Sequence, residues 1–240
     1  MAQAEKQKWF ALSLAVIVPA VLIALAAFSI VRGEPNAPAQ NELKVVGTIQ
    51  LPEPKLDGAV SLEKALATRR SIRQFTDEKF TNKQISQLAW AGQGITEKTR
   101  GLRTAPSARA TYPITLYLAT HSGLYIYRPA QNDLMIKQSV DVRQKLAGRQ
   151  NAIAKSGCTF IIASKVGNTT AKYGDRADKG AILEAGHIAQ NILLEATAMG
   201  LGGVPIGGFD PNEVGKICDL PADMEPVYLI AVGVPAQQNK

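Results

Sequence analysis

The chain of 240 residues is poor in the side chains that most often bind metal ions or form disulfide frameworks. It contains two histidines, His121 and His187, and two cysteines, Cys158 and Cys218. No Cys-x-x-Cys pair and no cluster of ligand residues occurs, so the sequence predicts no metal site. The distant cysteines are typical of buried apolar groups, and their pairing in an oxidising compartment stays open. The sequence also lacks internal repeats and low-complexity tracts.

Neither positive nor negative residues are in large excess. Lysine and arginine number 27 against 20 acidic residues, which gives a net charge of +7. This excess forms no basic stripe interleaved with aromatic residues, and no nucleic-acid-binding motif is present, so we expect no nucleic-acid partner. An anionic small molecule or an anionic membrane surface fits the charge as well. With 46% hydrophobic residues, the chain can bury one sizeable core behind an N-terminal extension.

One stretch near the N-terminus lacks charge altogether. Residues 9–31 are long enough to cross a bilayer, which takes about 20 apolar residues. Lys6 and Lys8 precede this run and favour a cytoplasmic N-terminus. We therefore predict that residues 1–32 form a single-pass membrane anchor. The domain that follows would then lie outside the cytoplasm, in the periplasm. The alternative is a signal peptide with a cleavage site at residues 37–39, which would give a secreted protein.

The remaining chain divides into a linker and a domain. Residues 33–58 are rich in proline and polar residues, which predicts a Pro-rich linker with a short strand within 45–51. Residues 59–240 form the globular domain. Ser61 is expected to cap a helix over 61–70, and the capping box at 81–84 to open a helix over 85–93.

Apolar runs and turn residues predict the other elements of the domain. We expect strands at 114–119, 124–127, 158–164 and 227–234, helices at 133–150 and 211–219, and an irregular segment at 165–179. The order of these elements indicates an α+β fold with one central, mostly antiparallel sheet flanked by helices.

A central helix begins near Glu184 and ends at a glycine-rich exit. One helical face consists of small and apolar residues, namely Ala185, Ala189, Ile192, Leu193 and Ala196. A separate polar stripe contains Glu184, His187, Asn191 and Glu195. The small face would allow another backbone to approach closely. The glycines from Gly200 onward end a helix instead of opening one, so they are not a dinucleotide fingerprint.

Two further stretches suit a flat, anionic ligand. Residues 205–208 form a loop of nearly bare backbone, whose N–H groups can press against something flat. Arg69, Arg70 and Arg73, with Ser71 among them, supply guanidinium and hydroxyl donors for a phosphate or another anion.

Four blocks in order resemble the nitroreductase family, and within it the branch of SagB-type azoline dehydrogenases. They are RRSIRQF at 69–75, APSARATYP at 105–113, KYGDR and LEAGHIAQN between 172 and 191, and GLGGVPIGGFD at 200–210. The resemblance covers roughly 51–235. It implies a nitroreductase-like sandwich, an intertwined homodimer, and FMN at the subunit interface. The small helical face would suit such a dimer.

The resemblance also assigns roles to residues. Those implied to bind FMN are Arg69, Arg70 and Ser71 at its phosphate, Arg73 at the pyrimidine edge, Pro106, Ser107 and Ala108 along the ring, and Pro205, Ile206, Gly207 and Gly208 near flavin N5 and O4. Lys172 and Tyr173 match a catalytic pair that assists proton removal in azoline dehydrogenases. Arg109 and Thr111 depart from the family pattern on the substrate side.

These features predict an FMN-dependent oxidoreductase that passes hydride or electrons through flavin N5 to a small acceptor such as a quinone or nitroaromatic. The alternative within the fold is azoline oxidation on a modified peptide. A third hypothesis, of another class, is a flavin-binding or docking module without turnover.

Overall fold

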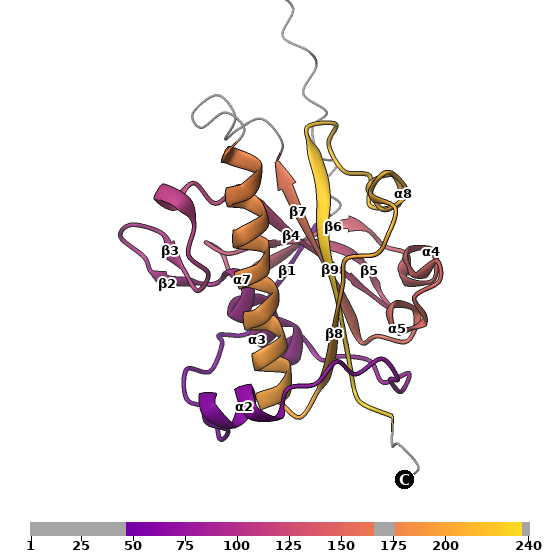
Figure 1. Cartoon of the computed structure of the whole chain (residues 1–240), viewed down its shortest axis with the longest axis horizontal. Coiled ribbons are helices and arrows are strands. Elements are labelled where there is room, and N and C mark those ends of the chain that lie inside the picture. Colours follow the sequence, from indigo (N-terminus) through magenta and orange to yellow (C-terminus); the bar gives the residue numbers. More distant parts are fainter. Residues whose placement is uncertain (1–46, 166–175, 237–240) are drawn as a thin grey trace, which may run out of the picture. The chain divides into compact units, whose positions relative to one another are not determined.

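The computed structural model describes residues 47–165 and 176–236 of the chain (Figure 1). The predicted anchor, the linker up to residue 46, and the predicted catalytic pair Lys172 and Tyr173 lie outside these residues. None of the described helices is both long enough and apolar enough to cross a membrane.

Within the described residues, seven strands form one sheet, in which every neighbouring pair is antiparallel. Their order across the sheet is β1–β6–β5–β4–β7–β9–β8. Their bounds are β1 Gly47–Gln50, β4 Ile114–Thr120, β5 Gly123–Arg128, β6 Asp133–Gln138, β7 Cys158–Lys165, β8 Gly202–Ile206 and β9 Met224–Gly233. A separate two-stranded hairpin consists of β2 Ile95–Glu97 and β3 Leu102–Arg103. The predicted α+β fold with a central antiparallel sheet is confirmed.

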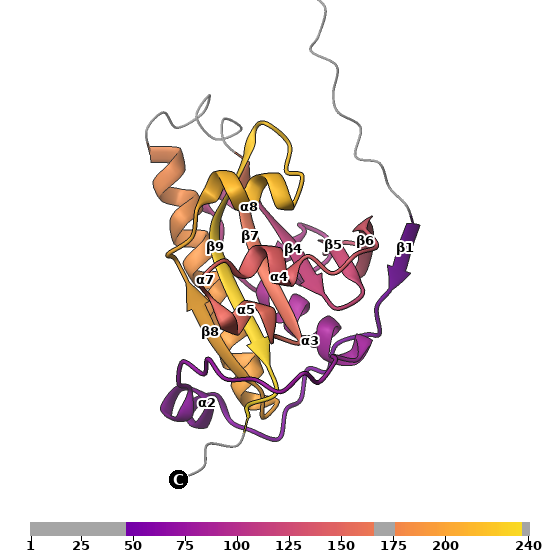
Figure 2. The same cartoon turned by 90° about the vertical axis from the view of Figure 1, so that its right-hand side faces the viewer.

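Helices cover both faces of this sheet (Figures 1 and 2). Their bounds are α2 Leu62–Thr68, α3 Asn82–Gln93, α4 Arg143–Ala147, α5 Asn151–Ala154, α7 Arg176–Ala198 and α8 Pro211–Ile217. Side chains alternate along β7, so Phe160 and Ile162 join the core under α3 and α7. Ile161 and Ala163 point the other way and join the core under α4, α5 and α8.

Both predicted helix starts are confirmed. The Thr81 side chain accepts a hydrogen bond from the Gln84 backbone, and the Gln84 side chain accepts one from the Thr81 backbone at 2.9 Å. This reciprocal capping satisfies two N–H groups that have no partner within the helix. At α2, the Ser61 hydroxyl accepts from the Lys64 backbone at 3.2 Å.

The expectation that the small face of α7 meets a second chain is wrong. Ala185, Ala189 and Ala196 are buried within their own subunit, as are Ile192 and Leu193. Glycine on α3 permits this close packing, because a Cβ atom at Gly92 would lie 3.0 Å from Ile192 Cδ1. The helix therefore uses its small residues to approach α3 and the sheet.

The segment 133–150 begins as a strand and not as the predicted helix. Arg128 and Asp133 form an ion pair across the end of the β5–β6 hairpin. Asn132 closes the turn with φ of 47°, a left-handed conformation that asparagine tolerates. β6 then pairs with β5 on one side and with β1 on the other. This pairing overrides the helical pattern, and helix α4 starts only at Arg143.

Two boundaries also differ from the prediction. The glycine-rich exit at Gly202–Ile206 is the edge strand β8 and not a loop, and Arg176 to Lys179 already belong to α7. An edge position tolerates Pro205, because one side of the strand needs no ladder hydrogen bond. The expected short strand within 45–51 is present as β1. The sheet thus begins inside the segment that we assigned to the linker.

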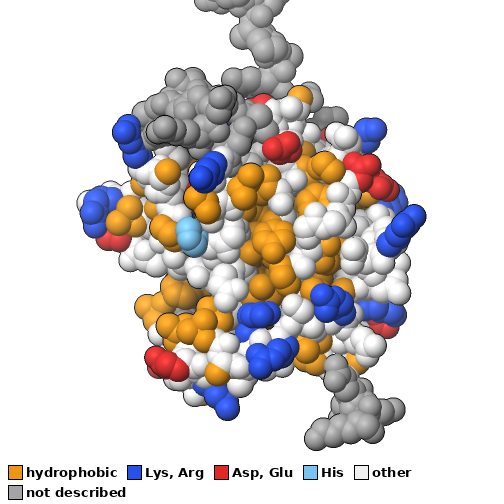
Figure 3. All heavy atoms as spheres, in the orientation of Figure 1, with side chains coloured by type: hydrophobic (Ala, Val, Ile, Leu, Met, Phe, Trp, Pro, Cys, Tyr) orange, Lys and Arg blue, Asp and Glu red, His pale blue; other side chains and the backbone are white. Residues whose placement is uncertain are grey.

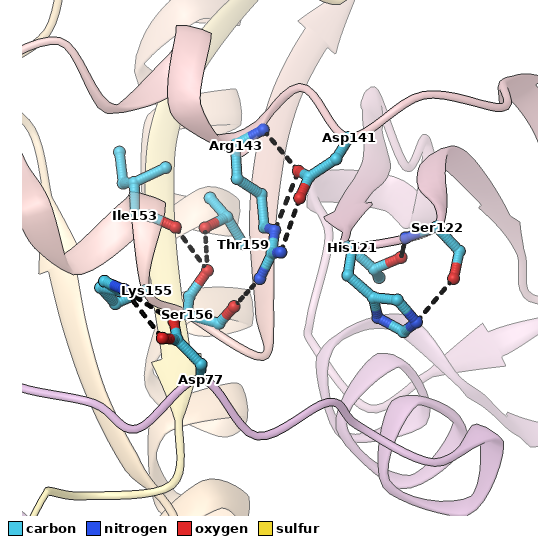
Figure 4. Close-up of polar contacts among 10 residues, drawn as sticks. Asp77, His121, Ser122, Asp141, Arg143, Ile153, Lys155, Ser156 and Thr159 are labelled. Atoms are coloured by element: carbon cyan, nitrogen blue, oxygen red, sulfur yellow. Dashed lines mark hydrogen bonds and ion pairs between the residues drawn. The ribbon is translucent and has the colours of Figure 1, made fainter.

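Polar contacts fix the segment after Arg73 against the α4–α5 layer (Figure 4). Lys155 forms an ion pair with Asp77 at 2.8 Å, and Arg143 pairs with Asp141 at 2.6 Å. Arg143 also donates to the Ser156 carbonyl. The Lys155 pair is exposed and is worth at most about 1 kcal/mol. The pair serves to position the chain, because it holds residues 71–80 against the sheet face that α5 covers.

Candidate functional site

The arginine-rich block lies directly beside the glycine-rich strand. α2 ends at Thr68 with Arg69 as its C-cap, and the chain then runs along β8, where Ser71 forms a parallel bridge with Gly203. The Ile72 amide donates to the Gly203 carbonyl at 3.1 Å. Gly202 permits this approach, because a Cβ atom there would lie 2.8 Å from Ile72 Cβ. The structure thus brings together two blocks that are more than a hundred positions apart in the sequence.

The three arginines of this block are not equivalent. Arg70 donates to the carbonyls of Ala67 at 3.1 Å and Arg69 at 2.8 Å, so its guanidinium caps the C-terminus of α2. The Arg69 and Arg73 guanidinium groups make no hydrogen bond or ion pair to any described residue. Figure 3 shows Lys and Arg side chains gathered on the lower part of this face. Two of the three predicted phosphate ligands, Arg69 and Ser71, therefore remain suited to that role.

The loop after β8 is bare and open above its backbone. A Cβ atom at Gly208 would meet nothing within 4 Å, and one at Gly207 only Tyr228 Cε2 at 4.0 Å. Gln150 donates to the Gly208 carbonyl at 3.4 Å, and Asp210 caps α8 after the loop. The side chain of Ile206 is buried in the core, so only its backbone is available to a ligand.

The third predicted block, Pro106 to Ala108, lies on a strained loop. Arg109, Ala110 and Tyr112 have φ of 53°, 53° and 46°, and a 3₁₀ turn covers Ala108–Ala110. Left-handed conformations of this kind cost about 1–3 kcal/mol each and persist only where the surroundings enforce them. Ser107 is held through its hydroxyl, which accepts from the Tyr112 amide at 2.9 Å.

One chain does not assemble all of these blocks at one place. Ser107 lowers the pKa of Glu184 in the first half of α7, whereas Gly203 packs against Leu193 in its second half. Glu184 and Leu193 are nine positions apart, which is about 13 Å along the axis at 1.5 Å per residue. In Figure 1, the β2–β3 hairpin and α2 likewise lie beside opposite halves of α7. The Ser107 loop therefore stands apart from the Arg69 block.

The donor set fits FMN. Unpaired guanidinium groups suit a phosphate, and the open space over Gly207 and Gly208 suits a flat ring approached by backbone N–H groups. Ser71 and Gly207 lie at opposite ends of β8, which matches an elongated ligand with one anionic end.

The profile of the Nitroreductase family matches residues 66–234. The chain belongs to the nitroreductase family. A protein of Methanocaldococcus jannaschii named as a nitroreductase is 36% identical over 194 residues, which is 77% of this chain and 95% of that protein. The FMN reductase (NADPH) of Bacillus subtilis is 25% identical over 186 residues, which is 71% of this chain but only 64% of that protein.

Solved structures of other proteins have the same fold. The crystal structure of a nitroreductase from Ralstonia eutropha matches with a TM-score of 0.73 and 26% identity, over 86% of this chain and 97% of that one. A chain of the E. coli microcin synthetase complex McbBCD, solved with truncated pro-microcin B17 bound, matches with a TM-score of 0.60 and 19% identity, over 89% of this chain and 87% of that one. The latter likeness is one of fold alone.

Family membership and the FMN reductase relative make the protein an FMN-dependent oxidoreductase. The individual site residues remain predictions from the motifs. Sequence reasoning missed a set of polar residues behind the Ser107 loop, namely the buried Gln93 and Glu184 and the half-buried Arg103 and Tyr112. The one available signal was Glu184, a carboxylate on a helix whose buried face is otherwise small and apolar.

Proposed function

We propose that the protein reduces a small, flat acceptor such as a quinone or a nitroaromatic at an FMN site built from two copies of the chain. The observation that carries this proposal is the bare backbone at Gly207 and Gly208, with open space on the side where a Cβ would point. An acceptor that only stacks on a ring needs little more than an open, flat surface. When bound, FMN supplies hydride or electron transfer through N5 of its ring.

The residues of this chain bind and orient that cofactor. Arg69 and the Ser71 hydroxyl hold the phosphate beside β8, and the positive charge of Arg73 stabilises negative charge at the pyrimidine edge of the ring. The Gly207 and Gly208 amides would be the donors available to N5 and O4. Arg70 contributes indirectly, because it caps α2, of which Arg69 is the C-cap.

A second copy completes the site with Pro106, Ser107 and Ala108. The separation of about 13 Å along α7 between the Ser107 contact and the Gly203 contact supports this arrangement. An apolar surface is available for the partner. Ile182 and Leu183 on α7 are 61% and 56% exposed, and Leu62 and Leu66 are exposed on neighbouring α2. Figure 3 shows apolar side chains along the middle of this face.

The dimer can be tested with a charge on that surface. Ile182→Asp is expected to give a monomer by light scattering and to weaken FMN binding at least about tenfold, because an unpaired carboxylate in an apolar interface costs several kcal/mol. Val140→Asp is the matched control, since Val140 is 59% exposed and lies before α4, away from α7. A dimer that survives Ile182→Asp would place the interface elsewhere.

The acceptor is tested by reoxidation of the dithionite-reduced protein. We expect quinones and nitroaromatics to restore the absorbance of oxidised flavin within seconds. Lys172→Ala should retain most of that rate, because a stacked acceptor needs no positioned base. Reoxidation by none of the panel would contradict the proposal and favour a flavin-binding module without turnover.

The second candidate is azoline oxidation on a modified peptide. The fold shared with the McbBCD chain and the Lys172-Tyr173 pair favour it. In this reaction Lys172 and Tyr173 would assist proton removal from the ring. An azoline peptide that reduces the flavin of the wild type but not of Lys172→Ala would support this candidate over the first.

We further propose that residues 1–32 tether the enzyme to a membrane, with the domain in the periplasm. The uncharged run at 9–31 is the basis for this proposal. The full chain is expected in the membrane fraction after carbonate washing, with its domain digested by protease added on the periplasmic side. A soluble periplasmic protein with its N-terminus near Gln40 would show signal cleavage and secretion instead.

A further inference from the structure

Five polar side chains form a closed ring behind the Ser107 loop. The Tyr112 amide donates to Ser107 Oγ at 2.9 Å, and the Arg103 amide donates to the Tyr112 hydroxyl at 3.1 Å. The Arg103 guanidinium donates to Gln93 Oε1, and Gln93 Nε2 donates to Glu184 Oε1 at 3.3 Å. The Ser107 side chain acts on Glu184 and lowers the pKa of its carboxyl, and this interaction closes the ring. The ring links α3, β3, the 106–112 loop and α7.

Two members of the ring are buried, and the ring contains one acidic and one basic residue. Glu184 is 2% exposed and Gln93 1% exposed, although both are polar. Burial raises the pKa of Glu184, and the hydrogen bonds from Ser107 and Gln93 and the charges of Arg103 and His187 oppose that rise. Arg103 lies 4.3 Å from the centre of the Tyr112 ring, which adds a cation–π contact. Arg103 Nε is buried without a hydrogen-bond partner, but its guanidinium is held by Gln93 and by the Tyr112 ring, so the network favours one arrangement of the segments that it joins.

The joined segments include the most strained loop in the described part of the chain. Ser107 and Tyr112 stand at the two ends of the residues with left-handed φ, and both are members of the ring. We propose that this ring is a positioning device, with Glu184 as its anchor, which fixes the 106–112 loop in the conformation that lines FMN. The claim that the loop lines FMN rests on the proposed function. The claim that the ring fixes the loop rests on the contacts within the ring.

Glu195 provides a matched control on the same helix. It too is a carboxyl whose pKa burial raises, although it is half-buried where Glu184 is buried, and Gln87 of α3 opposes that rise. It has no contact with the 106–112 loop among its hydrogen bonds. Replacing Glu184 or Glu195 therefore removes a carboxyl of α7 that interacts with a glutamine of α3, but only the former opens the ring.

The experiment compares Glu184→Leu, Glu184→Gln and Glu195→Leu in the full-length protein. Without FMN, we measure the rate of tryptic cleavage after Arg109, an exposed residue in the loop. With FMN, we measure affinity by fluorescence titration and the visible circular dichroism of the bound flavin. Glu184→Leu should be cleaved about tenfold faster, bind FMN about tenfold more weakly and change the dichroism. The reason is that losing a buried hydrogen-bonding group costs about 1.4 kcal/mol, which corresponds to a factor of ten.

Glu184→Gln should stay within about twofold of the wild type, because its amide oxygen can accept from Gln93 and its amide nitrogen can donate to Ser107 Oγ. Glu195→Leu should match the wild type in all three readouts. Equal effects of the two leucine variants would overturn the proposal, as would faster cleavage with unchanged FMN affinity and dichroism. If Glu184→Leu does not fold, Ser107→Ala opens the ring at its other side and carries the same expectations. A wild type that binds no FMN would contradict the proposed function, while the cleavage rates would still test the fixing role.

Discussion

Gly208→Val is expected to weaken FMN binding about a hundredfold or more while leaving the melting temperature of the cofactor-free protein unchanged. Gly208 is exposed, its φ lies outside the left-handed region, and a Cβ there meets nothing within 4 Å. Valine therefore fits the folded chain without strain. Its branched side chain would occupy the space over the backbone that the ring needs, and overpacking of this kind costs about 1–3 kcal/mol or more.

Variants of two other glycines distinguish a blocked FMN site from a destabilised fold. Gly215 in α8 also has open space at its Cβ, so Gly215→Val should leave FMN affinity unchanged. Gly203 has Leu193 Cδ2 only 2.7 Å from its Cβ position, so Gly203→Val should lower the melting temperature. Fluorescence titration and calorimetry of the three variants distinguish these outcomes. Unchanged FMN affinity in Gly208→Val would remove the β8 exit loop from the site.

Arg69→Ala is expected to weaken FMN binding about ten- to a hundredfold. It removes a charge-assisted hydrogen bond to a phosphate, which is worth about 1.5–3 kcal/mol. Arg70→Ala removes the same charge one position later, but its guanidinium is occupied by the carbonyls at the end of α2. We therefore expect less than about a threefold loss of affinity for Arg70→Ala.

Comparing Arg69→Ala with Arg70→Ala distinguishes a specific contact with the phosphate from a general effect of positive charge. Equal losses for the two variants, both abolished by about 0.5 M salt, would indicate that the arginines act only through screened charge. A loss confined to Arg69→Ala and retained at high salt supports direct contact with the phosphate. Riboflavin, which has no phosphate, should bind Arg69→Ala and the wild type equally.

Local chemistry predicted the elements whose signals are short-range. The Thr81–Gln84 capping box and the apolar run at 158–164 both appear where expected, because caps and continuous buried strands depend on adjacent residues. β6 was missed because its pairing with β1 and β5 depends on partners that lie elsewhere in the chain. The prediction that the small face of α7 contacts a second chain was wrong for the same reason. Nothing in that helix alone shows that Gly92 of α3 approaches Ile192.

The candidate site was predictable in part. The motifs identified the blocks, and the structure places Ser71 beside Gly203 as two of those blocks require. The sequence did not indicate that Arg70 turns back onto its own helix, nor that Arg103 and Glu184 join through Gln93. These contacts arise from turns and long-range packing, whereas a motif records only residue types in order.

Titration of FMN into the cofactor-free, full-length protein, with mass measured by light scattering at each step, tests the central claim most directly. A site shared between two chains predicts a dimer that binds two FMN molecules, one per chain, and Ile182→Asp should lose dimer and cofactor together. A monomer that binds FMN with the affinity of the wild-type dimer, or a protein that takes up no FMN, would contradict it.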